Sequence, residues 1–129
     1  MKQSVTFGPY SPVFKAGDTY YISGHLGVDS ITKHAPASVT EQTHLLFVNL
    51  KTSLLEADLT LDDIVKTTIY LKNIGDFALV NEVYESYFSN PRPARACVQV
   101  AELPRVTEDN SQVLIELDAV AYKAGKPHA

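Results

Sequence analysis

The segment at residues 112–122 constrains the fold more than any other part of the chain. Its odd positions are all apolar and recur at the period of two that is typical of a β-strand, at Val113, Ile115, Leu117, Ala119 and Ala121. Its even positions are mixed, with Leu114, Glu116, Asp118, Val120 and Tyr122. The odd face must therefore lie against a core. The even face carries too many apolar groups to lie fully in water, so we expect it to pack against further copies of the chain.

Two amphipathic helices are available to cover the odd face. Ser38 and Glu41 have the spacing of a capping box, and apolar residues then follow at helical intervals, at Leu46, Phe47, Leu50, Leu54 and Ala57. This pattern predicts a helix from Val39 to Ala57. Asn73 is placed to cap a second helix, which the prolines at 91 and 93 end. Its expected buried stripe is Phe77, Val80, Tyr84 and Phe88.

The remaining strands follow from turn signals and β propensity. Residues 11–15 and 19–23 predict a hairpin with a three-residue turn, and residues 64–71 and 95–100 predict two further strands. The order is strand, strand, helix, strand, helix, strand, strand. We therefore expect an α+β fold in which two helices pack on one face of a mixed sheet. A length of 129 residues favours one domain spanning 1–129.

Composition narrows the function classes. Eleven basic and fifteen acidic residues give a net charge of −4 without any block of like charge, which weighs against nucleic-acid binding. No apolar stretch approaches the roughly 18 residues needed to span a membrane. Residues 1–6 lack the apolar core of a secretory signal, and a lone cysteine, Cys97, fits a reducing compartment. We expect an intracellular, cytoplasmic protein.

Arg95 and Glu116 are the main candidates for chemistry. Arg95 begins a strand and shares one face of it with Cys97 and Gln99. Its rigid fork suits a planar carboxylate, although a surface or interface ion pair is the alternative. Glu116 lies among apolar neighbours and is either solvated or partly buried; partial burial would raise its pKa and suit proton transfer. Asp118, on the same face, is the rival acid.

The other reactive side chains give weaker signals. Cys97 is also explained as a small buried hydrophobe. Histidines stand at 25, 34, 44 and 128, without the HExxH or paired-cysteine spacing of a metal site, so no metal is expected. His44 is expected on the surface of the first helix. His25 follows Ser23-Gly24 at a strand end and is the histidine that invites a functional hypothesis. The sequence has no P-loop, nucleophile elbow or dinucleotide fingerprint.

Two segments carry a family resemblance, Pro93-Ala94-Arg95-Ala96-Cys97-Val98-Gln99-Val100-Ala101-Glu102-Leu103-Pro104 and Ile115-Glu116-Leu117-Asp118-Ala119-Val120-Ala121. Together they resemble the signature of the reactive intermediate deaminases, the RidA/YjgF family. Weaker matches lie at 8–11, 23–25, 63–71 and 77–84, so the resemblance covers roughly residues 8–121.

The resemblance implies a chorismate-mutase-like α+β fold and a homotrimer with clefts between subunits. It implies hydrolytic deamination of 2-iminopropanoate and 2-iminobutanoate to 2-oxo acids and ammonia, with no metal or organic cofactor. Arg95 matches the carboxylate-binding arginine of the family, and Glu116 matches the acid that positions or activates water. The predicted substrate-binding residues besides Arg95 are Tyr10, Ser23, Gly24, His25 and Cys97.

Four departures from the family pattern bear on substrate range more than on fold. His25 stands where glutamine is common, and Ala96 stands where serine or threonine is common. The loop at 105–112 is longer than the usual turn, and residues 28–34 lack a Thr-Gly turn. Two alternatives remain at this point. One is a non-catalytic trimer that binds small carboxylates through Arg95. The other is an endoribonuclease or translation inhibitor, an activity also attributed to relatives.

Overall fold

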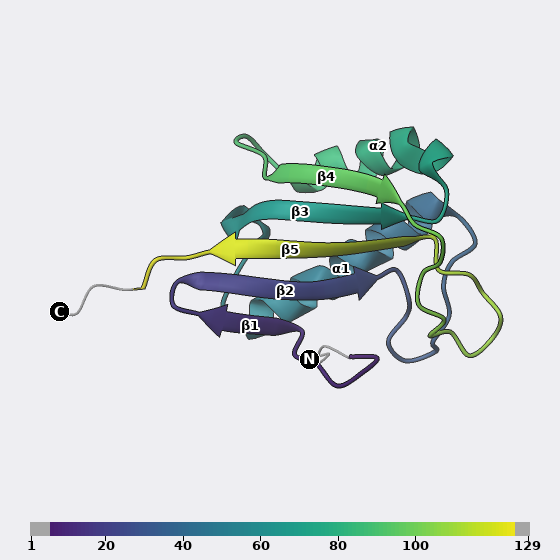
Figure 1. The fold of residues 1–129 in the computed structure, drawn as a ribbon, viewed down its shortest axis with the longest axis horizontal. Coiled ribbons are helices and arrows are strands. Elements are labelled where there is room, and N and C mark those ends of the chain that lie inside the picture. Colours follow the sequence, from purple (N-terminus) through teal and green to yellow (C-terminus); the bar gives the residue numbers. More distant parts are fainter. Residues whose placement is uncertain (1–5, 126–129) are drawn as a thin grey trace.

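Within residues 6–125, which the computed structural model describes, five strands form one mixed sheet in the order β1-β2-β5-β3-β4 (Figure 1). They are β1 (Val13–Ala16), β2 (Thr19–Leu26), β3 (Ile64–Leu71), β4 (Ala94–Gln99) and β5 (Ile115–Tyr122). β4 runs parallel to β3, and the other pairs are antiparallel. Residues 1–5 and His128, on which two sequence expectations rest, lie outside the described range.

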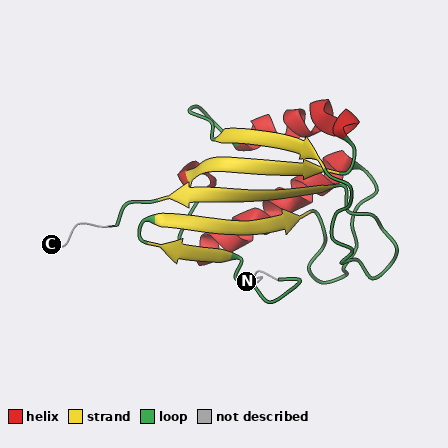
Figure 2. Ribbon diagram, in the orientation of Figure 1, coloured by secondary structure: helices red, strands yellow, loops and turns green. Residues whose placement is uncertain are grey.

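Both long helices lie on one face of the sheet, α1 (Val39–Glu56) and α2 (Phe77–Tyr87), so the α+β prediction is confirmed (Figure 2). Two 3-10 turns precede β3 and α2, η1 (Leu61–Asp63) and η2 (Ile74–Asp76). No helix of this described range combines the length and apolar character needed to cross a membrane.

The core lies between the helices and the odd face of β5, as the alternation predicts. Ile115, Leu117, Ala119 and Ala121 are at most 5% exposed. They belong to one cluster with α1 residues that are at most 1% exposed, among them Leu46, Phe47, Leu50 and Leu54. Burying each such leucine contributes about 1.5–3 kcal/mol, so this layer provides much of the stabilisation of the sheet.

Helix α1 begins and ends within one residue of its prediction. Ser38 has extended backbone, and its Oγ accepts a hydrogen bond from the Glu41 amide at 3.1 Å, as the capping motif requires. The helix ends at Glu56, and Ala57 is its C-cap. His44 is on the helix surface as expected, and its Nδ1 lies 2.8 Å from the Tyr87 hydroxyl.

The β1–β2 hairpin and the start of β5 differ from the prediction. Ala16 pairs with Thr19, so the turn has two residues rather than three, and Gly17 takes a left-handed φ of 63° that glycine tolerates. β5 begins at Ile115 rather than at 112. The buried Gln42 amide donates to the Gln112 carbonyl at 2.7 Å and accepts from the Leu114 amide at 2.8 Å. The Gln42 side chain therefore satisfies backbone groups of residues 112–114 that would otherwise bond to a neighbouring strand, and β5 begins after them.

The face of the sheet opposite the helices, called the open face below, is covered by the described chain only at one end. There the segments 27–37 and 100–113 cover a second apolar cluster, formed by Leu26, Val28, Ala35, Leu103 and Val113 (Figure 1). Elsewhere apolar side chains are exposed; Phe14 and Tyr21, which pair across β1 and β2, are 63% and 53% exposed. Such a surface needs further cover, and its burial against other copies stays a prediction.

Candidate functional site

A bulge in β2 positions the first part of the site. The pairing of β2 with β5 shifts register between Ile22 and His25, so that Ser23 and Gly24 together lie opposite Asp118. The Glu116 carboxyl group lies directly against Gly24. A Cβ atom at position 24 would lie 2.8 Å from Glu116 Cδ and closer still to Oε2, so any other residue there would force the carboxyl group to move. Glycine at 24 therefore creates the space that the Glu116 carboxyl group occupies.

Glu116 and Asp118 share the open face but differ in their partners. Burial raises the pKa of Glu116, and the neighbouring Asp118 charge raises it further. Asp118 Oδ2 accepts a hydrogen bond from the Tyr70 hydroxyl at 2.8 Å. Among the described residues, the Glu116 carboxyl group has no hydrogen-bond or ion-pair partner. Glu116 is therefore the better placed of the two acids to exchange a proton with a ligand.

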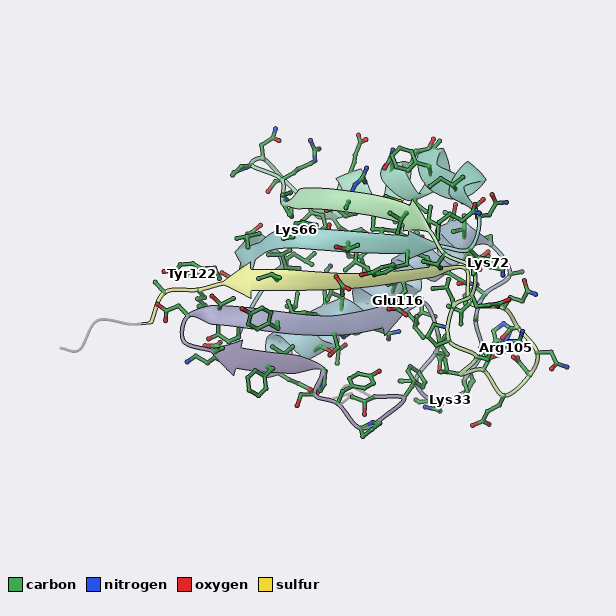
Figure 3. All side chains as sticks on the ribbon, viewed as in Figure 1. Lys33, Lys66, Lys72, Arg105, Glu116 and Tyr122 are labelled. Atoms are coloured by element: carbon green, nitrogen blue, oxygen red, sulfur yellow. The ribbon has the colours of Figure 1, made fainter. Side chains whose placement is uncertain are left out.

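These groups border a cavity of about 590 Å³ on the open face, called the open-face cavity below. Four of the predicted site residues line it, namely Tyr10, Ser23, Gly24 and Glu116, the last of which is labelled in Figure 3. The rest of the lining is mostly apolar or aromatic, with Phe7, Tyr21, Ile22, Leu26, Pro104, Val106, Ala119 and Val120 beside Asp118. Every charged group of this lining is acidic, so the cavity of one chain cannot neutralise an anionic ligand.

Arg95 lies on the other face of the sheet, at its β4 edge. It pairs with Thr67, whose buried side chain contacts Tyr84 of α2, and cross-strand partners point to the same face. Its Nη1 donates to Asn81 Oδ1 at 2.7 Å, and its Cζ lies 4.9 Å from the Tyr84 ring centroid and 5.3 Å from that of Phe77. One hydrogen bond and two cation–π contacts hold the guanidinium. Contacts with residues 6–125 use one of its five donors.

Arg95 and Glu116 consequently do not meet within one chain. β3 separates their strands, and the two side chains project from opposite faces of the sheet. The structure gathers Tyr10, Ser23 and Gly24 around Glu116, while Arg95 belongs to a second arrangement with α2. Each chain thus carries two separate arrangements, an acidic cavity on the open face and an arginine held against α2.

The sequence pattern of the family described as endoribonuclease L-PSP matches residues 1–123. The chain belongs to this family. A RutC family protein of Pyrococcus abyssi is 42% identical over 117 residues, which cover 90% of this chain and 87% of that protein. The RidA crystal structure from an Antarctic Psychrobacter has a TM-score of 0.85 at 37% identity, covering 95% of this chain and 94% of that one. TdcF of E. coli with bound serine has a TM-score of 0.83 at 34% identity, with the same coverages.

The RidA/YjgF resemblance is therefore confirmed, and so is the fold that it implies. The chain has the same fold as the RidA and YjgF crystal structures, a single mixed sheet with two helices on one face. Within this family fold, the acidic cavity and Arg95 lie on opposite sides of the sheet.

The structure places His25, another predicted site residue of this L-PSP family chain, toward the helices. His25 Nδ1 lies 2.7 Å from the Ser23 carbonyl, and Nε2 lies 2.7 Å from Ser53 Oγ on α1. Burial lowers the pKa of His25, so the ring is neutral at pH 7. Because His25 ties the β2 bulge to α1, it supports the position of Gly24 rather than lining the cavity.

Cys97 also belongs to the helix-facing side. It pairs with Ile69 on the face that carries Arg95, and it packs against the main core cluster. Burial raises the pKa of its thiol and the Arg95 charge lowers it only in part, so Cys97 is protonated at neutral pH. No group of three His, Cys, Asp or Glu side chains within residues 6–125 is arranged to hold a metal ion.

Asn81 and Phe77 have roles beside Arg95 that the sequence reasoning missed. Phe77 is predicted in the buried stripe of α2, but it is 40% exposed at the first residue of the helix, where its ring contacts the Arg95 guanidinium. Phe77, Asn81 and Tyr84 recur at intervals of four and three, which puts them on one helix face. That spacing, together with an arginine near the start of the following strand, is the sequence signal that could have predicted these contacts with Arg95.

Proposed function

We propose that this protein hydrolyses 2-imino acids to 2-oxo acids and ammonia. The observation that carries the proposal is the half-buried, unpartnered Glu116 carboxyl group, whose pKa is raised and which faces a ligand-sized cavity. Membership of a family that includes RidA supports it. The bound serine of the similar TdcF structure supports a ligand of amino-acid size with a carboxylate.

The substrate carboxylate needs a cation that the open-face cavity of one chain does not have. We propose that a neighbouring copy places Arg95 at this cavity, in a homotrimer with sites at the subunit interfaces. This arrangement would also cover apolar side chains of the open face, among them Tyr21 at 53% exposed. The stacked and hydrogen-bonded Arg95 is already ordered, so little conformational entropy would be lost on binding.

In the proposed reaction, Arg95 of the neighbouring copy holds the substrate carboxylate through paired hydrogen bonds. Glu116 accepts a proton from water as the water oxygen attacks the C=N carbon, and it passes this proton to the imine nitrogen, which gives a carbinolamine. Glu116 then takes the hydroxyl proton as the C=O bond forms and delivers it to the amine nitrogen, so that the C–N bond breaks and ammonia leaves. One water is consumed, and no electrons are exchanged. The raised pKa of Glu116 suits both proton transfers.

The ribonuclease activity named in the family description is less well supported. RNA recognition requires cations along a phosphate backbone, whereas the net charge is −4 and the charged lining of the open-face cavity is acidic. A non-catalytic carboxylate binder would use Arg95 equally well but would not need the unpartnered Glu116.

The test is to release 2-iminopropanoate in situ with an amino-acid oxidase and to follow its loss against a chemical imine trap. We expect the protein to accelerate hydrolysis well beyond buffer. Binding of pyruvate without any acceleration would overturn the deaminase proposal in favour of the non-catalytic binder.

A further inference from the structure

The segment between β4 and β5 forms one wall of the open-face cavity through Pro104 and Val106. It returns over the end of the open face beside the segment that follows β2 (Figure 1). Its two ends are anchored by Leu103 and Val113, which are 9% and 8% exposed and pack in the second apolar cluster. The second apolar cluster therefore holds both ends of this wall in place.

Three hydrogen bonds join the middle of this segment to residues 33–35; we call them the loop clamp. His34 Nδ1 lies 2.6 Å from Asp109 Oδ2, the Glu108 amide donates to the Lys33 carbonyl at 3.2 Å, and the Ala35 amide donates to Ser111 Oγ at 3.0 Å. The first of these also brings opposite charges together when His34 is protonated.

Asp109 fixes the loop from within as well. The Asp109 carboxyl group accepts hydrogen bonds from Ser111 and, to a smaller effect, from His34. These lower its pKa to about 2, so the group stays ionised at neutral and mildly acidic pH. An irregular surface segment ordinarily keeps much of its conformational freedom. The loop clamp restricts the conformations of residues 108–111 and so keeps Val106 in the lining of the open-face cavity.

The wall is apolar. Phe7, Leu26 and Val120 line the cavity together with Pro104 and Val106. The cavity of one chain has a volume of about 590 Å³, which lies in the range of about 300–1,000 Å³ typical of small-molecule sites, and its wall at Val106 is supplied by the same chain as Glu116. Burying one additional CH₂ group is worth about a fourfold gain in binding, so an apolar substrate side chain is favoured here.

We infer that segment 104–111, held by the loop clamp, is a specificity element whose Val106 wall favours 2-imino acids with branched apolar side chains over 2-iminopropanoate. The inference rests on the proposed function, because it assigns the substrate class of the same site. Val106 and the clamp residues take no part in the proton transfers. Their substitution should therefore change the choice between substrates rather than the chemistry.

The test compares kcat/KM for the imino acids of leucine and alanine, both released by an amino-acid oxidase. We expect the wild-type ratio to be at least about tenfold in favour of the leucine-derived imine, from its three additional carbons. Val106→Asp should lower this ratio about tenfold. Its added charge acts on both anionic substrates alike, so the ratio rather than either single rate is the readout. Ile31→Asp, at a residue 75% exposed on the neighbouring loop and outside the cavity lining, is the matched control and should leave the ratio unchanged.

Asp109→Ala and His34→Ala test the clamp without altering the cavity lining, and each should lower the ratio about threefold. Hydrogen exchange should rise at 106–111 in both variants. A wild-type ratio near one that Val106→Asp and Asp109→Ala leave unchanged would overturn the inference while leaving the deaminase proposal standing.

Calorimetric binding of 4-methyl-2-oxopentanoate and pyruvate separates the two failures. If no imine is turned over but the binding ratio still falls in Val106→Asp, the deaminase proposal fails and the specificity wall stands. If Val106→Asp does not fold, Val106→Thr provides the same comparison with nearly unchanged volume, and an unchanged ratio in that variant counts against the wall.

Discussion

The two faces of the sheet hold their principal charged groups in contrasting ways. On the helix-facing side, Arg95 makes cation–π contacts with the rings of Phe77 and Tyr84 and a hydrogen bond to Asn81. On the open side, Glu116 is half-buried beside Gly24 and has no partner within the described chain. The cation is stabilised where it stands, whereas the acid is destabilised in its charged form.

This contrast supports the proposal that each face carries half of a site. A fixed cation is suited to orienting a ligand, because it need not rearrange on binding. An acid with a raised pKa is suited to moving protons. In that proposal neither half completes a catalytic centre alone, because the sheet separates Arg95 from Glu116 within one chain. The following predictions probe the two halves, beginning with the largest expected effect.

Replacing Glu116 should have the largest effect on turnover. Glu116→Gln keeps the shape of the side chain but removes the proton acceptor, so kcat should fall about 100-fold or more. Asp118→Asn is the matched control on the same strand face, and it should lose less than about fivefold. Steady-state kinetics with 2-iminopropanoate measures both. Equal losses in the two variants would show that Glu116 has no special role.

Replacing Arg95 should affect ligand binding more than the proton-transfer steps. Arg95→Lys keeps the charge but loses the paired hydrogen bonds and the planar stacking, so the Kd for pyruvate should rise about 10- to 30-fold. Asn81→Ala removes one orienting hydrogen bond and should raise it about threefold. Calorimetry measures both values. An Arg95→Lys variant that binds pyruvate normally would show that the arginine face has no ligand role.

Gly24→Ala tests the contact between the β2 bulge and the acid. The added Cβ would displace the Glu116 carboxyl group, and kcat should fall about tenfold. The same substitution in a Glu116→Gln background should cost little more, because the proton acceptor is already absent. Additive losses in this double-mutant cycle would mean that Gly24 acts through some other contact.

Stability should respond modestly to pH through His25. The folded chain disfavours the protonated ring, so the unfolded state binds the proton first as pH falls through 6.5. The free energy of unfolding should therefore decline from pH 6.5 downward until the lowered pKa of the folded state is reached. The raised pKa of Glu116 acts in the opposite sense above 4.5. Thermal melts of His25→Gln should lose the decline that begins at pH 6.5, and an unchanged profile would rule out this role of His25.

Much of the fold was predictable because its signals are local. The Ser38 cap and the apolar spacing that follows fix α1 within one residue, and the alternation of residues 115–121 fixes the buried face of β5. The placement of Arg95 and Cys97 on one strand face needed only a period of two.

Other features depended on contacts between residues distant in the sequence. Gln42 satisfies backbone groups 70 and 72 residues away, which delays the start of β5. His25 meets Ser53 28 residues later, so its turn toward α1 was invisible in the local pattern. That Arg95 and Glu116 lie on opposite faces follows from the pairing of β3 with both β4 and β5. Sequence spacing alone does not give that pairing.

The central claim is that one working site combines Glu116 of one copy with Arg95 of another, and mixing two inactive variants tests it most directly. Arg95→Ala and Glu116→Gln chains are each measured alone and then after refolding together in equal amounts. If the site is shared between copies, random assembly restores about a quarter of the wild-type activity, because both donors of a site are intact in one pairing out of four. If the mixture is no more active than the separate variants, although the chains have exchanged, the two residues do not form a site shared between copies.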